Sequence, residues 1–149
     1  MVTRAPELTI RPLRDDELRA AFPIVVQLRQ HLDVQEFMAC AVRQSGAGYE
    51  LIGAFIDQTI VGVMGMRPVE TLARGKHLHV DDLVVDASAR GRGYGKALLD
   101  HAERESETRG CAWVFLDSRP EVLTFYEGLG YSRHTAILVT KHMATAINE

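Results

Sequence analysis

Runs of β-branched and aromatic residues, several of them alternating with polar residues, predict the strands of this chain. The predicted strands are residues 8–13, 49–57, 59–68, 76–85 and 111–117, followed by one or two more within 131–143. The short connection through Asp57 and Gln58 predicts that 49–57 and 59–68 form an antiparallel hairpin. Residues 111–117 are almost wholly apolar, as in a buried strand. A helix separates them from 76–85, so these two strands should be parallel.

Apolar stripes and helix-capping residues predict the helices between these strands. An apolar face marks residues 17–30 as a helix that Asp15 or Asp16 can cap and that Pro23 should kink or split. The other predicted helices are residues 33–46, with Asp33 as N-cap and Gly46 near the C-cap; a helix that begins near Tyr94 and stops at Gly110; and residues 120–130, closed by Gly128 or Gly130.

Composition excludes several classes of protein. A chain of 149 residues without repeats or linkers is expected to form one domain, 1–149. A net charge of −3 argues against a nucleic-acid-binding protein, because gripping phosphates needs a basic surface. Cys40 and Cys111 form no disulfide or zinc pattern, and no segment approaches the ~20 apolar residues of a membrane span. We therefore expect a cytoplasmic protein without a membrane segment.

The loop that joins strand 76–85 to the next helix has the properties of an anion-binding site. The first N–H groups of a helix have no partners within it, and the helix dipole adds positive charge there. Gly91, Gly93 and Gly95 let the backbone approach a ligand closely, while Arg90 and Arg92 supply charged donors. A diphosphate is the natural ligand of such a loop.

The spacing of the glycines excludes two commoner phosphate-binding motifs. A dinucleotide fingerprint fails because Lys96 or Leu98 stands where its last glycine is required. A Walker A loop fails because Arg90 stands where its first glycine is required. From the loop alone, a glycine-rich turn that binds nothing stays open as an alternative.

The order Arg90, Gly93, Gly95 resembles the central motif of the GCN5-related N-acetyltransferase (GNAT) superfamily: Arg or Gln, two residues, Gly, one residue, Gly or Ala. The flanking segments "DDLVVD", "GCAWVFLDS" and "TFYEGLGY" are similar to the family's strands before and after the loop and to its closing segment. The resemblance is strongest over residues 76–131. It implies an α/β (α+β) fold with a central mixed, mostly antiparallel sheet of six to seven strands, about four helices, and a parallel strand pair at the acyl-CoA site.

The resemblance also implies transfer of an acetyl group from acetyl-CoA to a primary amine, and it indicates which residues bind the coenzyme. The loop should hold the pyrophosphate, the outgoing strand should pair with the pantetheine arm, and Arg119 stands where the family often has an asparagine for that arm. The implied coenzyme-binding residues are Leu83, Val84, Val85, Arg90, Gly91, Arg92, Gly93, Tyr94, Gly95, Lys96 and Arg119.

Candidate catalytic residues follow from the same resemblance. Asp81 stands at the position of the family's frequent glutamate base, and its shorter side chain favours proton transfer through a bridging water. Asp82 should point to the opposite face of a regular strand, unless a bulge reverses the assignment. His79 is an alternative base, because histidine ordinarily titrates near neutrality. Tyr126 matches the family tyrosine that protonates the departing thiolate. An ion-paired carboxylate couple and a packing tyrosine are the structural alternatives.

Several neighbouring residues have simpler interpretations. His77 and His79 share a strand face but are expected to line the acceptor site or a solvated strand end rather than bind a metal. Cys111 is expected to be a small core residue rather than a nucleophile, and Trp113 and Phe115 to be core. No metal site is expected.

The acceptor and the assembly are less constrained by the sequence. Residues 14–48 should shape the choice of a small-molecule or peptide amine acceptor. Many relatives are dimers, so a homodimer is expected. The competing function is a non-catalytic acyl-CoA-binding sensor or regulatory protein of the same fold, which keeps the loop and does no chemistry.

Overall fold

The structure is a computed structural model that describes residues 4–144. The chain divides into two compact units, Met1–Asp117 and Ser118–Glu149, and each is described by itself. The helices and strands of the first unit are, in order, β1 (Leu8–Pro12), α1 (Leu18–Leu28), α2 (Val34–Ser45), β2 (Glu50–Ile56), β3 (Thr59–Thr71), β4 (Gly75–Val85), α3 (Tyr94–Thr108) and β5 (Trp113–Leu116). The second unit contains the short helix α4 (Leu123–Gly128), preceded by the 3₁₀ turn Pro120–Val122.

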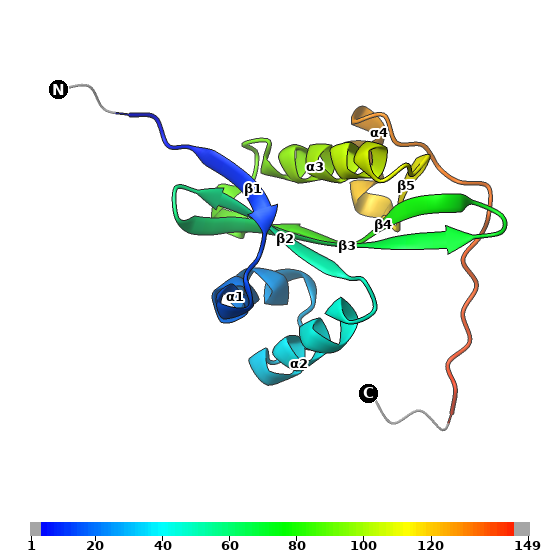
Figure 1. The fold of residues 1–149 in the computed structure, drawn as a ribbon, viewed down its shortest axis with the longest axis horizontal. Coiled ribbons are helices and arrows are strands. Elements are labelled where there is room, and N and C mark those ends of the chain that lie inside the picture. Colours follow the sequence, from blue (N-terminus) through cyan, green and yellow to red (C-terminus); the bar gives the residue numbers. More distant parts are fainter. Residues whose placement is uncertain (1–3, 145–149) are drawn as a thin grey trace. The chain divides into compact units, whose positions relative to one another are not determined.

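The strands of the first unit form one mixed sheet in the order β1-β2-β3-β4-β5 (Figure 1). The first three pairings are antiparallel, and β4 and β5 are parallel. The hairpin of β2 and β3 and the parallel pair β4 and β5 confirm the prediction from the sequence. The sheet has fewer strands than expected because residues 131–144 form none. An alternating pattern alone does not make a strand, because the backbone N–H and C=O groups must also pair with a neighbouring strand.

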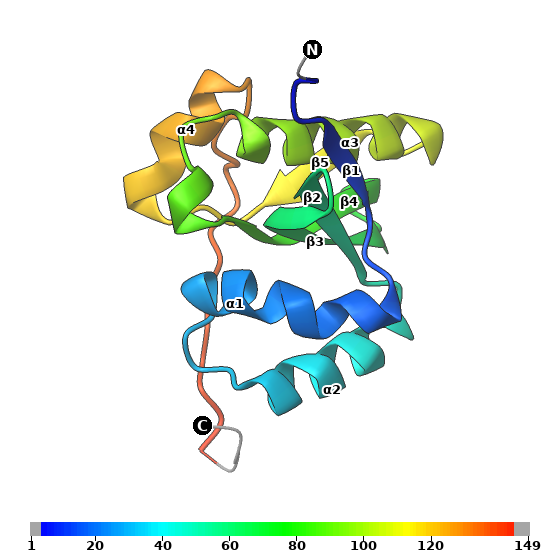
Figure 2. The ribbon, with the colours of Figure 1, turned by 90° about the vertical axis from the view of Figure 1, so that its left-hand side faces the viewer.

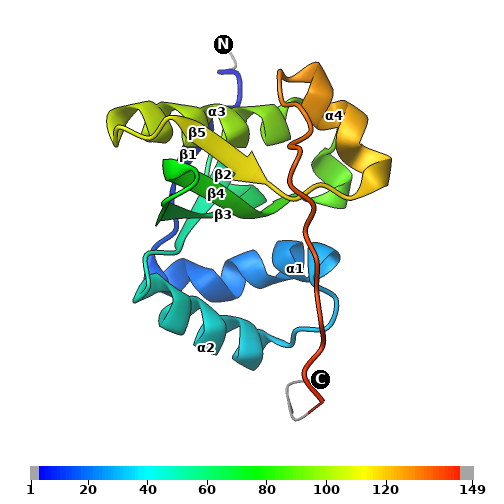
Figure 3. The same cartoon turned by 90° about the vertical axis from the view of Figure 1, so that its right-hand side faces the viewer.

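Helices cover the two faces of this sheet. Figures 2 and 3 show α1 and α2 on one face and α3 on the other. Between these two helices and the sheet lies a core cluster, in which Phe37 of α2 and Ile24 of α1 pack with Val63 of β3 and Val84 of β4. On the other face, Leu98 and Leu99 of α3 are fully buried. The sheet is therefore held from both sides by apolar burial.

The ends of the helices agree with the sequence in one case and differ in another. Asp33 caps α2, its carboxylate accepting the N–H of Glu36 at 2.8 Å, and Gly46 is the C-cap residue. Asp15 does not cap α1, because it lies with Asp16 in a 3₁₀ turn that precedes the helix. Pro23 lies inside α1 and does not split it.

The strand β5 is less buried than its sequence predicts. Trp113 is 57% exposed, although an almost wholly apolar strand indicated a core position. Within the described residues β5 is an edge strand, paired on one side only, which leaves one flank of its side chains without a covering neighbour. No helix in residues 4–144 is long and apolar enough to cross a bilayer.

Candidate active site

A β-bulge in β4 determines how its two consecutive carboxylates face. Gly65 of β3 pairs with Asp82, but the next residue, Met66, pairs with Val80, so Asp81 is an extra residue on β4. Asp81 contacts the side chain of Arg67, and Asp82 contacts Tyr49, which packs on the Cα of Gly65. Gly65 and Arg67 are two residues apart on β3 and share a face. Both carboxylates therefore lie on the α1 and α2 face, because the strand is not regular here and the bulge reverses the assignment of Asp82 to the opposite face.

Both oxygens of Asp82 have strong hydrogen-bond partners. Arg29, at the C-terminal end of α1, donates through Nε to Oδ1 at 2.8 Å, and the Tyr49 hydroxyl donates to Oδ2 at 2.5 Å. The same Arg29 donates through Nη2 to the main-chain carbonyl of Asp81 at 2.8 Å. Burial is the largest cause that raises the pKa of Tyr49 far above its ordinary value, and the neighbouring Asp82 carboxylate adds to it.

Asp81 has a different set of partners. Arg67 of β3 donates through Nε to Oδ2 at 2.7 Å and through Nη2 to Oδ1 at 3.3 Å. The Nε2 atom of His79 lies 3.8 Å from Oδ1 of Asp81 and 3.7 Å from Oδ2 of Asp117, just after β5. Oδ1 of Asp81 has only long contacts and is the less engaged of its two oxygens.

The half of β4 that follows the bulge is unpaired on the side of β5. The parallel ladder ends where Val80 pairs with Leu116, while β4 continues to Val85. On its other side this half stays in the ladder with β3. Among residues 4–144 no strand pairs with Leu83, Val84 and Val85 on the β5 side. Their main-chain groups on that side are the kind that an extended ligand can bind.

The glycine-rich loop begins at a well-ordered turn. Asp86 accepts the N–H of Ser88 at 3.1 Å and the side-chain amide of Gln27 at 2.7 Å. Hydrogen bonds from Ser88 are the largest cause that lowers the pKa of Asp86. Arg90 donates back to the carbonyl of Val85 at 3.2 Å. The loop is therefore fixed to the end of β4.

The rest of the loop opens into α3. Gly91 and Gly93 have φ angles of 78° and 84°, which residues with a side chain rarely adopt. A Cβ at either position would meet no atom within 4 Å. Gly93 is the N-cap of α3, and its carbonyl accepts the N–H of Ala97 at 3.0 Å. Tyr94, Gly95 and Lys96 thus form the first turn, where N–H groups lack partners within a helix. The open space beside Gly91 and Gly93 fits the close approach of a phosphate.

The remaining candidates, Arg119 and Tyr126, lie in the second unit. The ring of Tyr126 packs in edge-on fashion against Phe125 at 5.1 Å and against Tyr131 at 6.1 Å between centroids. Burial raises the pKa of the Tyr126 hydroxyl, and the positive charge of Arg119 opposes this more weakly. Arg119 lies 3.8 Å from the carboxylate of Glu121. Whether Tyr126 meets Asp81 at one site stays a prediction.

Three residues at this site escaped the sequence analysis. Arg29, Tyr49 and Arg67 come from the end of α1, the residue before β2, and β3, and no motif links them. They meet only because the sheet order places β3 beside β4 and packs α1 over both. The one available signal was the pair of adjacent carboxylates within a strand, which require partners when partly buried.

Two predictions for the start of β4 need correction. His77 is not on a solvated strand end: it is 2% exposed, contacts the carbonyl of Gly75 through Nδ1 at 3.0 Å, and packs edge-on against Phe115. Cys111 is only half-buried rather than a core residue, because it precedes β5 in the turn that leaves α3. No group of three His, Cys, Asp or Glu side chains in residues 4–144 is arranged to hold a metal.

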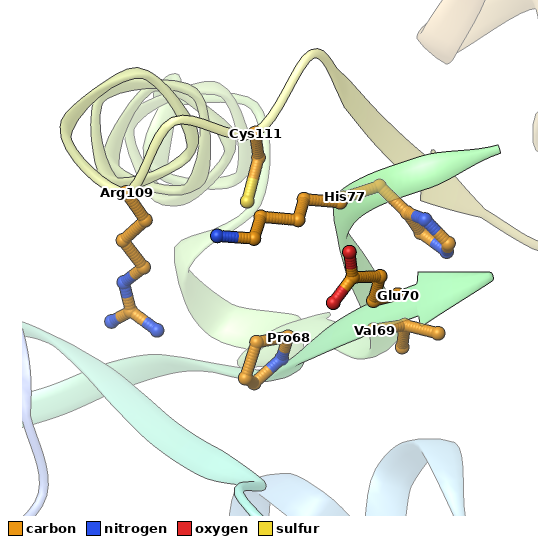
Figure 4. Close-up of a pocket in the computed structure, with 7 residues that line it drawn as sticks. Pro68, Val69, Glu70, His77, Arg109 and Cys111 are labelled. Carbon is orange, nitrogen blue, oxygen red and sulfur yellow. The ribbon is translucent and has the colours of Figure 1, made fainter. Parts of the chain in front are cut away.

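Cys111 lines a pocket of about 290 Å³ at the opposite end of β4 from the glycine loop. In Figure 4 the Cys111 sulfur and the Glu70 carboxylate point into this space, and the His77 ring is turned away. Arg109 also lines it, but its guanidinium is bound by Glu50 at 2.6 and 2.8 Å and by Glu105 at 2.9 Å. None of the predicted site residues lines this pocket.

Comparison with known sequences assigns the chain to one family. The profile of the Acetyltransferase (GNAT) family matches residues 11–131. The chain is 32% identical over 118 residues to the uncharacterized N-acetyltransferase YhdJ of Bacillus subtilis, covering 74% of this chain and 81% of that protein. It is 40% identical over 122 residues to glucosamine 6-phosphate N-acetyltransferase 1 of rice, Oryza sativa, covering 80% of this chain and 65% of that protein.

Solved structures agree with this assignment. An acetyltransferase from Trypanosoma brucei superposes with a TM-score of 0.78 at 30% identity, covering 91% of this chain and 100% of that one. A glucosamine-6-phosphate N-acetyltransferase from Arabidopsis thaliana gives a TM-score of 0.74 at 26% identity, over 91% and 98%. The chain belongs to the acetyltransferase (GNAT) family, and its class is that of the acyl-CoA-dependent N-acetyltransferases.

Proposed function

We propose that this protein transfers the acetyl group of acetyl-CoA to a primary amine by direct attack of the amine on the thioester. The observation that carries the proposal is the second half of β4. It is bulged at Asp81, unpaired toward β5, and leads directly into the glycine-rich loop and the N-terminus of α3. This arrangement offers main-chain donors and acceptors to an extended arm and unpaired N–H groups to a diphosphate, in that order along the chain.

The coenzyme would be bound mainly by backbone. The N–H groups from Arg90 to Lys96, including those of Gly91, Arg92, Gly93, Tyr94 and Gly95, would hold the pyrophosphate, aided by the dipole of α3. The main chain of Leu83, Val84 and Val85 would pair with the pantetheine arm. Arg119 would add a charged contact with a coenzyme phosphate. The open space beside the two glycines with positive φ supports this placement.

The chemistry requires that a proton leave the acceptor before attack. A protonated amine has no lone pair, so its proton passes to the Asp81 carboxylate, directly or through a water. The neutral nitrogen then forms a bond to the thioester carbon, and an amide N–H of β4 stabilises the resulting oxyanion. The nitrogen bonded to that carbon carries one proton more than an amide and loses it to water, and the carbon–sulfur bond breaks as the carbonyl re-forms. Tyr126 donates its proton to the departing thiolate, and its raised pKa keeps the hydroxyl protonated until that step.

One observation favours the competing function. Arg67 engages both oxygens of Asp81, at 2.7 and 3.3 Å, and therefore competes with any amine or water for its lone pairs. A protein that binds acyl-CoA without chemistry would need no free carboxylate here. His79, between Asp81 and Asp117, is the alternative base if Arg67 keeps Asp81 occupied.

The acceptor is the least constrained part of the proposal. Relatives named for glucosamine 6-phosphate make that amino sugar the first small molecule to test. Other small amines and peptides with a free amino group follow. We also propose that the chain acts as one domain, since the family match at 11–131 runs from the first compact unit into the second. A cytoplasmic location and a homodimer are proposed from the sequence alone.

The experiment measures thermal stability with and without acetyl-CoA, then thiol release with a panel of amines. A ligand that binds only the native state raises the melting temperature by mass action. Stabilisation with thiol release on an amine supports the transferase. Stabilisation without release on any amine of the panel supports the sensor. No stabilisation at millimolar acetyl-CoA contradicts both.

A further inference from the structure

We propose that Tyr49, Asp82 and Arg29 are positioning residues that hold the bulge of β4 in place and so aim its acyl-binding half. The inference rests on the proposed function, because it concerns the main-chain groups that would contact the thioester. Asp82 contributes no proton transfer in this account. Its role is to fix the backbone that carries Asp81 and the residues after it.

The hydrogen bonds of Asp82 differ from those of an ordinary surface ion pair. Each carboxylate oxygen has its own donor, Arg29 on Oδ1 and Tyr49 on Oδ2. A carboxylate with both oxygens bound at 2.5 to 2.8 Å is held in one orientation. Neither oxygen is left with the freedom that a general base needs. The less engaged Oδ1 of Asp81, one residue earlier, keeps that freedom.

Arg29 connects the carboxylate to the bulge itself. Its Nη2 donates to the carbonyl of Asp81, which is the residue that the ladder leaves unpaired. A bulge disrupts the regular ladder at its extra residue, so this carbonyl needs a partner from elsewhere. Arg29 supplies that partner from the C-terminal end of α1. One guanidinium thus fixes both the side chain of Asp82 and the backbone of Asp81.

Tyr49 reaches Asp82 because the opposite residue on β3 has no side chain. A Cβ at Gly65 would overlap the hydroxyl and ring of Tyr49, and Gly65 is the residue that pairs with Asp82. Tyr49 therefore lies directly over the ladder position at which the bulge begins. Its raised pKa keeps the hydroxyl protonated, so it remains a donor across the working pH range.

Burying polar groups in this network costs free energy unless every one of them is hydrogen-bonded, which argues for a specific structural role. Removing one partner of a partly buried charged group leaves that group unsatisfied, which costs more than the bond itself contributes. Three polar side chains and one glycine from four segments of the chain converge on a single irregularity. The irregularity lies at the start of the strand segment that is open toward β5.

The test compares Tyr49→Phe and Asp82→Asn with Glu17→Gln as a matched control. Tyr49→Phe keeps the ring over Gly65 and removes only the hydroxyl. Glu17 is likewise a carboxylate held by an arginine, with Oε2 2.7 Å from Arg11, but it lies before α1 and away from β4. Three quantities are measured: kcat per coenzyme-binding site, Kd for coenzyme A, and amide hydrogen exchange of peptides spanning residues 81–85.

The expected result is a fall of about tenfold in kcat for each of the two test variants, the size of one lost charged hydrogen bond. Kd for coenzyme A stays within about twofold, because the glycine loop is untouched. Hydrogen exchange in 81–85 accelerates by about tenfold relative to Glu17→Gln, which leaves kcat and Kd unchanged. The acid limb of the kcat/KM profile keeps its position in Asp82→Asn.

Two results would overturn the inference. Exchange in 81–85 as slow as in the wild type in both test variants would show that the network does not hold the bulge. An acid limb that disappears in Asp82→Asn but not in Asp81→Asn would make Asp82 the base. If the wild type acetylates no amine, the proposed function fails by that observation, and hydrogen exchange alone decides the positioning role.

Discussion

The two consecutive carboxylates of β4 differ in how closely their oxygen atoms are hydrogen-bonded. Asp82 has a close donor on each oxygen, whereas Asp81 has a close donor on Oδ2 and only long contacts on Oδ1. From the sequence, Asp81 was favoured over Asp82 by the resemblance and by the alternation of side chains along a regular strand. The bulge removes the second reason, because it turns both side chains to the same face. The close hydrogen bonds on both oxygens of Asp82 now distinguish the two residues.

We expect Asp81→Asn to lower kcat by about a hundredfold or more, the usual contribution of a general base. Asparagine has nearly the same shape but cannot accept the proton of the ammonium group. Kd for coenzyme A should stay within twofold of the wild type, measured by calorimetry. Asp16→Asn, at an exposed carboxylate before α1, serves as the control and should leave both values unchanged. An Asp81→Asn enzyme with full kcat would transfer the role to His79.

Tyr126 should act as an acid over an unusually wide pH range. Its pKa is raised above the ordinary value of 10.0 by burial, so the neutral, proton-donating form persists to higher pH than in a free tyrosine. We expect kcat to show no alkaline decline below about pH 10 that depends on this residue. Tyr126→Phe should lower kcat by about tenfold with little change in coenzyme affinity. An alkaline decline near pH 8 that disappears in Tyr126→Phe would contradict the assignment.

At the scale of the elements, backbone conformation rather than side-chain chemistry determines the shape of the glycine-rich loop. Gly93 is the N-cap of α3 at φ 84°, and the equally left-handed Gly75, at φ 67°, is the first residue of β4. Each has open space where a Cβ would be. A side chain at either position would be strained by the positive φ angle. The two positions differ in whether a ligand is expected beside them.

Gly93→Val should therefore abolish coenzyme binding, raising Kd by more than about tenfold, because the new side chain fills the space of the pyrophosphate. Gly75→Val should cost a similar amount of stability, about 1 to 3 kcal/mol, from the same unfavourable φ, and leave Kd unchanged. Calorimetry with coenzyme A and thermal unfolding measure the two quantities. Equal losses of binding in both variants would mean that strain alone, and not the loop, determines affinity.

The connection between β1 and α1 depends on Glu17. Hydrogen bonds from Arg11 are the largest cause that lowers the pKa of Glu17 from 4.5 to about 2. A carboxyl with a depressed folded-state pKa stabilises the protein above its unfolded value and loses that contribution as the pH falls through the folded value. We expect Glu17→Gln to cost about 1 kcal/mol at pH 7, and the difference from the wild type to shrink between pH 4.5 and 2. A difference that stays constant with pH would contradict the ion pair.

How far the sequence predicted these elements depends on how local each cause is. The cap at Asp33 and the hairpin of β2 and β3 depend on neighbouring residues and were predicted correctly. The exposure of Trp113 and the lack of strands in 131–144 depend on which distant segments pair, which an apolar pattern does not specify. The glycine-rich loop was identified from the sequence because its motif is a local spacing of arginine and glycine residues. Arg29 and Tyr49 were missed because only the tertiary fold brings them to Asp82.

At the scale of the whole molecule, the chain combines a sheet unit with a short second unit that carries Tyr126. The family match at 11–131 covers most of the first unit and ends within the second. The apolar side chains Ile137, Leu138 and Val139 in the second unit are exposed, at 84%, 77% and 84%. Exposed apolar runs of this kind are typical of surfaces that another chain covers.

We expect the protein to be a homodimer in solution. Light scattering coupled to size-exclusion chromatography should give twice the chain mass of 16.6 kDa at micromolar concentration. The triple change of Ile137, Leu138 and Val139 to Ser should shift the equilibrium toward monomer if these residues form the contact, because it removes their apolar area. A wild-type monomer would remove the prediction, and a dimer insensitive to the triple change would place the interface elsewhere.

The central claim is direct transfer of an acetyl group from acetyl-CoA to an amine, and a single-turnover experiment tests it most directly. Enzyme in excess over acetyl-CoA is mixed with an accepted amine, stopped by acid at successive times, and analysed by mass spectrometry for acetylated amine and acetylated protein. The account predicts that the acetylated amine appears as acetyl-CoA disappears, with no acetyl group on the protein at any time. An acetyl group that appears first on the protein, for example on Cys111, or acetyl-CoA that stays bound and intact, would contradict it.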